Sequence, residues 1–385
     1  MNRLLNAKFT AEDVQVALKS LAPLKAPGPD GLPAIFYQRF WDIVGKKVTD
    51  YVLAVLNERA SMEGIGEGLV VLIPKVKIPV RVKEFRPISL CNVTYKLIDK
   101  MLAIRLRGIL DRIISPSQSA FVPGRLITDN VIVGFEYLNS LRNRRLGKVG
   151  QIALKLDMNK VYDRVEWGFI RGVMSKIGFD CGWIGKIMKY VQSASYSFLI
   201  NGEVKEKVIP KRGLRQGCPF SPFLFLFWAE GLTALLSRVE REGHVHGIKV
   251  VRAAPSISHL LFADDSLIFA KASSDECKCI KQLLEVYKED SGQSINFEKS
   301  ALTFSPNTPA GIRAEIRDLL MLMLFHVMIG ILGFLRLLAG TRGSFSDPSR
   351  TRFGRSYTGG NISCFLLEGE KFRLRLWLKR CLLMP

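Results

Sequence analysis

Two adjacent carboxylates, Asp264 and Asp265, stand between two apolar runs in the segment HLLFADDSLIFA at 259–270. The apolar runs predict a pair of strands with both acids at the hairpin tip. Neighbouring carboxylates repel each other when ionised, so a shared cation would stabilise them. A third acid, Asp157, closes the segment QIALKLDM at 151–158, which has the pattern of a buried strand.

These three acids predict a metal site only if their strands adjoin in one sheet. Asp157, Asp264 and Asp265 would then gather at one edge and could hold two divalent cations about 3.5–4 Å apart. Such a pair activates a 3′-hydroxyl on one side and stabilises a departing pyrophosphate on the other. Carboxylate oxygens suit Mg²⁺. Taken singly, an aspartate at such a position is more often an ordinary turn residue.

Composition indicates a globular protein with a polyanionic partner. The 385 residues are 48% hydrophobic, enough for packed cores in two or three domains. A net charge of +21 favours nucleic acid over an anionic membrane surface. The seven scattered cysteines include no C-x-x-C pair, so they indicate neither a disulfide framework nor a zinc site and suit a reducing compartment. The first residues lack the pattern of a secretion signal.

The elements that would position the acids are helices and hairpins in runs. One amphipathic helix begins behind Thr10, and further helices are predicted at 35–59, 95–114, 167–177, 183–192, 217–238 and 274–290. Strands are predicted at 68–76, 151–158 and 294–304, with hairpins at 195–210 and 259–270. Asn201-Gly202 predicts the turn of the first hairpin. This order predicts an α+β fold, an antiparallel sheet with helices on one face.

Five motifs stand in order within residues 5–310: FRPISLCNVTYKLIDKMLAIRL (85–106), QSAFVPGRLITDN (118–130), LKLDMNKVYDRVEW (154–167), GLRQGCPFSPFLFLFWAEGL (213–232) and FADDSLIF (262–269). Together they resemble the reverse transcriptase of plant LINE-type non-LTR retrotransposons. KAPGPDGLPAIFYQRFW (25–41) is similar to the segment that precedes this domain. The resemblance implies a right-hand polymerase palm and fingers.

The same resemblance implies roles for the acids and for one aromatic residue. Asp157 and Asp264 would be metal ligands, and Asp265 would be the partner acid of the turn and a third ligand. Tyr162, five residues after Asp157, would be the aromatic gate whose ring excludes a 2′-hydroxyl and so selects deoxynucleotides. The alternative for Tyr162 is a core aromatic beside the strand.

Four further residues would bind the substrate. Gln216 and Gly217 would lie beneath the incoming nucleotide and the template base, where a missing side chain allows close approach of the backbone. Lys75 in LIPK and Arg86 in FRPIS would clamp the triphosphate, because cations offset charge on the transferring phosphoryl group. The alternatives are that Gly217 only makes the turn into its helix and that the two cations are solvated surface groups.

Two cations and three departures complete the comparison with the family. Lys299 in INFEKS would protonate the pyrophosphate as a catalytic residue, and Arg125 would contact a phosphate of the nucleic acid template. Cys218 stands where the family usually has Asp after Gln-Gly, and Asn159 and Val161 replace the usual Ser and Ala. None of these departures removes a metal ligand.

The resemblance divides the chain into an N-terminal extension (1–60), fingers (61–150), a palm with finger elements (151–318) and a tail (319–385). The family pattern ends after Asp318, where an apolar run, Leu319–Leu335, has the hydropathy of a short membrane span. Codons allowed for 321–335 and 353–372, read one nucleotide earlier, can encode segments similar to the primer grip and thumb of the family. We therefore interpret 321–385 as a frameshift product and expect the thumb to be absent or scrambled.

The expected function is RNA-directed DNA polymerisation with two Mg²⁺ ions, an RNA template, a DNA primer and deoxynucleoside triphosphates. One alternative is an inactive retrotransposon relic that keeps the fold and binds nucleic acid nonspecifically. Another is a membrane-attached basic protein anchored by Leu319–Leu335, whereas the main interpretation involves no membrane. The sequence leaves the oligomeric state open. A nuclear rather than cytoplasmic location is inferred only from the need of such elements to reach chromosomal DNA.

Overall fold

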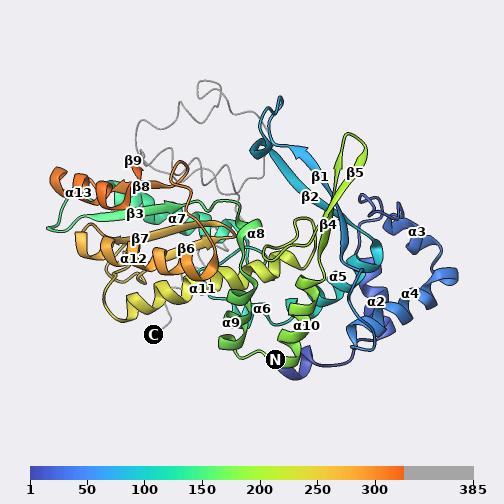
Figure 1. The fold of residues 1–385 in the computed structure, drawn as a ribbon. Coiled ribbons are helices and arrows are strands. Elements are labelled where there is room, and N and C mark those ends of the chain that lie inside the picture. Colours follow the sequence, from blue (N-terminus) through green and yellow to red (C-terminus); the bar gives the residue numbers. More distant parts are fainter. Residues whose placement is uncertain (325–385) are drawn as a thin grey trace, which may run out of the picture.

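The computed structural model describes residues 1–324, which form two sheets and the helices that pack on them (Figure 1). The thumb, the frameshift interpretation and most of the apolar run at 319–335 concern residues outside this range.

A five-stranded sheet carries the acid-bearing strands. Its strand order is β6-β7-β3-β8-β9, and all neighbours are antiparallel except β8 and β9. The strands are β3 (Gln151–Leu156), β6 (His259–Phe262), β7 (Asp265–Lys271), β8 (Ala301–Phe304) and β9 (Met323–Leu324). The predicted hairpin around the two adjacent acids is confirmed.

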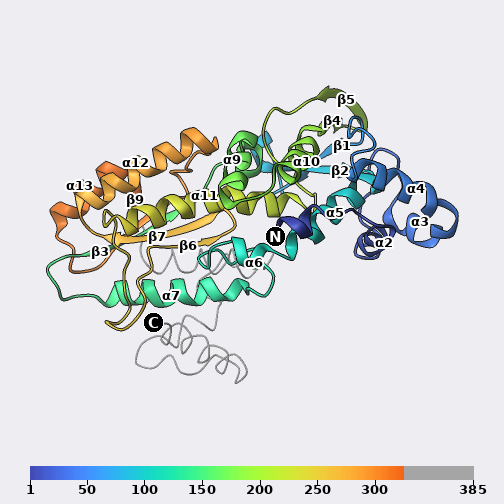
Figure 2. The ribbon, with the colours of Figure 1, turned by 90° about the horizontal axis from the view of Figure 1, so that it is seen from below.

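Helices cover both faces of this sheet (Figure 2). On one face, α11 (Ser221–Arg241) and α12 (Ser274–Ser291) pack in the same core as Leu154 and Ile268. On the other face, α7 (Ile127–Asn143) packs against Leu267 and Phe269 in a separate core. The prediction of helices on one face is therefore wrong, because both sides of β3 and β7 are apolar and the sequence analysis did not recognise α7.

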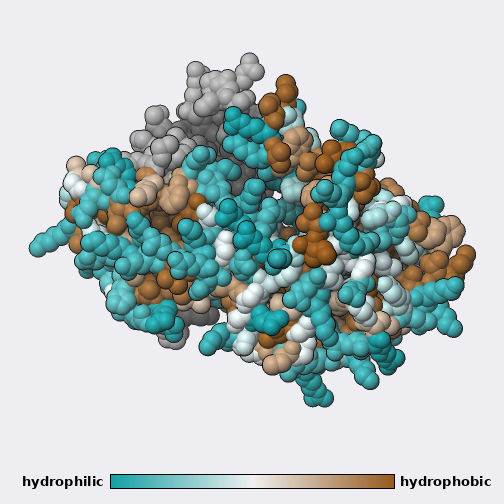
Figure 3. Space-filling view, viewed as in Figure 1, coloured by the Kyte–Doolittle hydropathy of each residue, from teal (hydrophilic) through white to brown (hydrophobic). Residues whose placement is uncertain are grey.

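A four-stranded sheet stands beside the first, at the right of Figure 1. Its order is β2-β1-β4-β5, with β1 and β4 parallel. The strands are β1 (Glu67–Pro74), β2 (Phe85–Cys91), β4 (Ser195–Ile200) and β5 (Glu203–Val208). Asn201 and Gly202 have φ values of 53° and 84°, so the predicted hairpin turn is confirmed. Apolar side chains gather at the outer end of the β1–β2 hairpin (Figure 3).

The remaining helices precede the four-stranded sheet, connect the strands or follow β8. Thr10 and Asp13 form a capping box at the start of α2, the helix predicted to begin behind Thr10. The helices are α1 (Asn2–Leu5), α2 (Ala11–Lys19), α3 (Ala34–Arg39), α4 (Trp41–Leu56), α5 (Val93–Arg107), α6 (Leu110–Ile113), α8 (Val161–Arg164), α9 (Trp167–Ile177), α10 (Cys181–Gln192) and α13 (Ala310–Leu320), with a 3-10 turn at Val82–Glu84.

The predicted helices at 35–59 and 95–114 are each broken once, at Phe40 and at Gly108–Ile109. The predicted strand at 294–304 is wrong in its first half, because only 301–304 pair with β3.

The helix α11 is the central core element of the molecule. Among residues 1–324 it is the one helix long and apolar enough to cross a membrane, and 56% of its apolar window is buried inside the protein. Phe225, Phe227 and Trp228 are fully enclosed. Burial against α9 and α12 accounts for its apolar composition.

Candidate active site

The pairing of β3 with β7 brings the three predicted acids to one edge of the five-stranded sheet. Leu156, the last residue of β3, lies opposite Ser266 of β7. Asp157, the next residue after β3, therefore comes level with Asp265, the first residue of β7. Phe262 pairs with Asp265, which leaves Ala263 and Asp264 as the turn. The condition on which the predicted metal site depends is therefore met: the acids share a sheet and an edge.

Hydrogen bonds from two side chains hold the turn that presents Asp264. Ala263 has a φ of +51°, a conformation uncommon for a residue with a side chain. Its N–H donates to Oε1 of the buried Gln118 at 3.1 Å. The side-chain amide of Asn130 donates to the Leu261 carbonyl at 2.7 Å. Both contacts come from the segment before β3, so α7 and its preceding loop fix the hairpin tip.

The carboxylate of Asp157 is oriented by the chain that leads into β8. Asn296 Nδ2 donates to Asp157 Oδ1 at 3.2 Å, and the Asn296 N–H donates to the Asp157 carbonyl at 2.8 Å. The Asp157 N–H donates to Ser300 Oγ at 3.1 Å. Asn296 and Ser300 were not among the predicted site residues, and their closeness to Lys299 in the INFEKS motif is the signal that could have found them.

Charge is concentrated at this edge. Desolvation raises the pKa of Asp265 to about 6, although Lys155 Nζ lies 3.9 Å from its carboxylate and favours ionisation. Desolvation and the charge of Asp157 raise the pKa of Asp264, and the charges of Lys299 and Arg86 oppose that rise. Arg86 and Lys299 therefore act electrostatically on the acids from two different parts of the fold.

The donor set suits a hard divalent cation, because a cation would relieve both the desolvation and the mutual repulsion of these carboxylates. Within residues 1–324, however, no three acidic, histidine or cysteine side chains lie close enough together to hold a metal ion. The carboxylates must draw closer to share one. Carboxylate oxygens fit Mg²⁺, but among the described residues the three carboxylates are farther apart than a shared ion requires.

Tyr162 on α8 lies next to this cluster. Its ring stacks on Phe225 of α11, with centroids 5.4 Å apart and planes inclined by 16°. Desolvation and the charge of Asp264 raise the pKa of its hydroxyl to about 12. Tyr162 therefore packs on the core, as its alternative interpretation predicts, and lies within electrostatic reach of Asp264; its role as an aromatic gate stays a prediction.

Residues 213–217 form a loop, here the tether loop, that contacts β2 and the segment that follows β3. The Leu214 N–H donates to the Tyr162 carbonyl at 2.6 Å, and the Gln216 carbonyl accepts from the Ser89 N–H of β2 at 3.0 Å. Gly217 has a φ of +105°, and a Cβ added there would lie 3.3 Å from the Ser89 oxygen. Gln216 and Gly217 thus lie between β2 and the segment that follows β3.

The comparison with known proteins agrees with this arrangement. The reverse transcriptase (RNA-dependent DNA polymerase) family matches residues 73–327, more than half of the chain. The chain belongs to the reverse transcriptase family. Membership implies a palm-like fold, and members of this family generally use divalent metal ions.

Relatives of this reverse transcriptase come from retrotransposons. An uncharacterized 149 kDa protein of transposon TX1 from Xenopus laevis is 29% identical over 297 residues, 77% of this chain and 22% of the relative. The Pol polyprotein of the type-2 retrotransposable element R2DM from Drosophila melanogaster is 27% identical over 265 residues, 68% of this chain and 23% of the relative. The chain therefore spans about a fifth of the length of these relatives.

A plant sequence matches over a shorter range. An uncharacterized mitochondrial protein of Arabidopsis thaliana is 49% identical over 69 residues, 18% of this chain and 57% of the relative. The identification of a LINE-type reverse transcriptase domain is confirmed, and its plant origin stays a prediction.

Two of the predicted contact residues hydrogen-bond to main-chain carbonyls of this reverse transcriptase. Lys75 is exposed just beyond β1, and its ammonium donates to the Lys83 carbonyl at 3.2 Å. Arg125 is 15% exposed, and its guanidinium donates to the carbonyls of residues 111, 114, 115 and 118 and to the Asp111 carboxylate. The structure gives Arg125 a role in fixing this loop. Its contact with a template phosphate stays an untested prediction.

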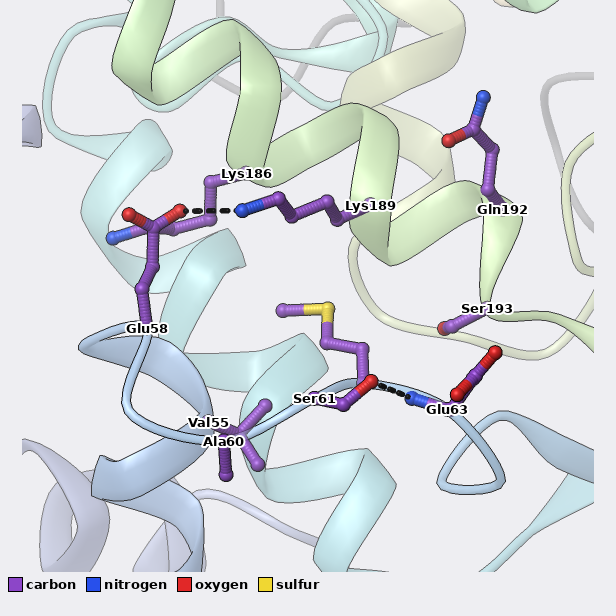
Figure 4. A pocket seen from close by; sticks show the side chains of 10 residues that line it. Val55, Glu58, Ala60, Ser61, Glu63, Lys186, Lys189, Gln192 and Ser193 are labelled. Carbon is purple, nitrogen blue, oxygen red and sulfur yellow. Dashed lines mark hydrogen bonds and ion pairs between the residues drawn. The ribbon is translucent and has the colours of Figure 1, made fainter.

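A cavity of about 510 Å³ lies apart from the acids, between the loop after α4 and helix α10 (Figure 4). Lys189 and Glu58 form an ion pair of 3.3 Å across it. None of the predicted site residues lines this cavity.

Proposed function

We propose that this chain adds deoxynucleotides to a primer 3′-hydroxyl under the direction of an RNA template. The observation that carries the proposal is the convergence of Asp157, Asp264 and Asp265 at one sheet edge, with the cations Arg86 and Lys299 acting on them. Acids beside cations suit a reaction in which negative charge on a phosphoryl group must be bound and transferred.

The three aspartates are the proposed ligands of two Mg²⁺ ions. When bound, the ions would lower the pKa of the primer hydroxyl and offset the charge of the departing pyrophosphate. Asn296 orients Asp157, and Lys155 limits the cost of ionising Asp265. These contacts keep the carboxylates available as oxygen donors.

Other residues bind and select the nucleotide in this proposal. The Tyr162 ring lies under the sugar and excludes a 2′-hydroxyl. Gln216 and Gly217 present the main chain beneath the base pair. Arg86, with Lys75 farther out on the hairpin, binds the triphosphate, and Lys299 gives a proton to the pyrophosphate.

We also propose the division into an extension (1–60), fingers (61–150) and palm (151–318). The strands β4 and β5 belong to the fingers in space although they follow β3 in sequence, because β4 pairs with β1. A basic channel between these parts would bind template and product through their phosphates.

A second candidate is nucleic acid binding without catalysis. It is favoured by the open spacing of the acids among the described residues and by Cys218 in place of the usual Asp.

Primer extension on an RNA template with Mg²⁺ separates the two candidates. We expect incorporation by the natural chain and a loss of at least about 10³-fold in Asp264→Asn, because several kcal/mol of transition-state stabilisation would go. The matched control is Asp50→Asn, which alters an exposed aspartate on α4 and should leave the rate unchanged. No incorporation by the natural chain, with RNA binding intact, would favour the second candidate.

A further inference from the structure

Two buried cysteines bring their sulfur atoms together where the tether loop meets the four-stranded sheet. Cys91 is the last residue of β2, and Cys218 follows Gly217. Their Sγ atoms lie 4.0 Å apart. The side chains are 1% and 5% exposed, and both thiols are free.

The main chain fixes this approach. The hydrogen bond from the Ser89 N–H to the Gln216 carbonyl joins the two segments two residues before each cysteine. Gly217 packs closely against Ser89, with space for no more than a strained Cβ. Because a disulfide has an S–S distance of about 2.05 Å, the sulfurs need to close by roughly 2 Å, a distance that side-chain rotation and small main-chain shifts can supply.

A fixed cation lies against one of the two sulfurs. Arg215 Nη1 donates to Cys91 Sγ at 2.8 Å. The Arg215 guanidinium is in turn held over the rings of Tyr95 and Tyr196, 4.6 Å and 5.1 Å from their centroids, and Nη2 donates to the Gly66 carbonyl. This cation cannot turn away without losing all of these contacts.

The surroundings of the two thiols shift their pKa values in opposite directions. The hydrogen bond with Cys218 and the charge of Arg215 lower the pKa of Cys91, whereas burial and the hydrogen bond with Cys91 raise the pKa of Cys218. A cationic neighbour favours the reactive thiolate. Cys91 therefore has the character of the attacking thiol and Cys218 that of the resolving thiol.

We propose that Cys91 and Cys218 are an oxidation site that closes to a disulfide when a hydroperoxide reaches it. The Cys91 sulfur attacks a peroxide oxygen, the O–O bond breaks, and the leaving oxygen takes a proton to give water or an alcohol. Cys91 is then a sulfenic acid. The Cys218 sulfur attacks the Cys91 sulfur, the S–S bond forms, the S–O bond breaks, and the hydroxide leaves as water with the Cys218 proton. The two thiols lose two electrons, and the peroxide gains them.

The bond would link β2 covalently to the tether loop. The readout of the proposal is this bond, so it stands or falls independently of the proposed polymerase function. Other cysteines in the described part of the chain offer internal comparison: Cys181 is exposed, and Cys277 and Cys279 stand two residues apart on α12, where side chains do not face each other.

Peptide mapping tests the proposal directly. The folded chain is treated with hydrogen peroxide, its remaining thiols are blocked with N-ethylmaleimide, and it is digested with trypsin without reduction. Cys91 lies in peptide 84–96, because Arg86 precedes Pro87 and resists cleavage, and Cys218 lies in peptide 216–238. We expect one species whose mass is the sum of the two peptides less two hydrogens, and we expect dithiothreitol to remove it.

Cys91→Ser and Cys218→Ser should each abolish the linked species, whereas Cys181→Ser should leave it unchanged. The proposal is wrong if peroxide oxidises Cys181 while Cys91 and Cys218 are recovered as N-ethylmaleimide adducts. It is also wrong if Cys91 is oxidised to a sulfinic acid without becoming linked to Cys218. The natural chain decides this outcome by itself, so poor folding of a serine variant leaves the test intact.

Discussion

Asp265 combines deep burial, 5% exposed, with a carboxylate that must ionise to bind a cation. Desolvation raises its pKa to about 6, and the charge of Lys155 only partly opposes the rise. Ionisation of Asp265 therefore costs the folded chain free energy unless a cation neutralises the carboxylate. Functional residues often lower the stability of the fold in this way.

This burial predicts a dependence of stability on pH. The pKa of Asp265 in the folded chain, about 6, lies above its ordinary value of 3.8, so the folded chain binds more protons than the unfolded chain between these values. Its stability therefore falls as pH rises through that window. We expect Asp265→Asn to raise the free energy of unfolding by about 1–3 kcal/mol at pH 8, with the gain vanishing below about pH 4. Urea denaturation across this range measures it, and an equal gain at every pH would contradict it.

Added Mg²⁺ should stabilise the natural chain, since an ion that binds the folded state alone shifts the unfolding equilibrium by mass action. We expect the thermal midpoint to rise with Mg²⁺ concentration and the rise to shrink strongly in Asp157→Asn. The same rise in the variant would place the bound ion elsewhere on the molecule.

Tyr162 gives a prediction of specificity. If its ring occupies the space of a 2′-hydroxyl, Tyr162→Val should increase incorporation of ribonucleotides relative to deoxynucleotides by about 10-fold or more, a change of roughly 1.4 kcal/mol. Tyr162→Phe keeps the ring and is the matched control. Single-nucleotide extension with both kinds of triphosphate measures the ratio, and equal ratios in Val and Phe variants would leave only the packing role on Phe225.

The tether loop joins β2 to the segment that follows β3. Gly213 has a φ of +89°, and a Cβ added there would lie 2.9 Å from the Asp163 oxygen. Gly243, after α11, has a similar φ of +75° but nothing within 4 Å. The pair separates the cost of the backbone conformation from the cost of the clash.

We expect Gly243→Ala to lower the free energy of unfolding by about 1 kcal/mol and Gly213→Ala by about 2–4 kcal/mol, because only the second meets a backbone atom. Chemical denaturation of both variants measures the difference. Equal losses would mean that the loop shifts to make room.

Periodicity predicted most elements because their burial repeats with the period of a helix or strand. Helix 167–177 is confirmed as α9, and the hairpins at 195–210 and 259–270 are confirmed. The helix α7 was missed although Val133, Tyr137 and Leu141 recur at helical spacing, since the β-branched residues at its start resemble a strand. The parallel pairing of β1 with β4 was not predicted, because it joins residues far apart in sequence.

The acids of the site were predicted because their signal is local in the sequence, whereas their hydrogen-bond partners are distant in it. A pair of carboxylates between apolar runs is a local signal. Asn296, in contrast, reaches Asp157 across 139 residues of sequence, and Gln118 reaches Ala263 across 145. Such contacts depend on the tertiary arrangement, and the only local signal for either residue is the INFEKS motif that contains Asn296. Arg125 was predicted from its motif position alone; the fold uses its guanidinium to bind main-chain carbonyls, and its contact with a template phosphate stays a prediction.

At the scale of the whole molecule, the net charge of +21 predicts how the chain binds RNA. Contacts to phosphates release counterions, so affinity for a single-stranded RNA should fall about 10²–10⁴-fold between 50 and 200 mM salt. Unrelated RNA sequences of equal length should bind alike. Fluorescence anisotropy at several salt concentrations measures the slope, and a flat response would show that base contacts rather than charge dominate.

The tether loop also restricts how the two sheets can move. It hydrogen-bonds to β2 on one side and to the segment after β3 on the other, so a rotation of the four-stranded sheet would displace Gln216 and Gly217, the proposed floor of the nucleotide site. On the proposed function, any displacement of the four-stranded sheet would therefore change the geometry beneath the nucleotide base at the same time.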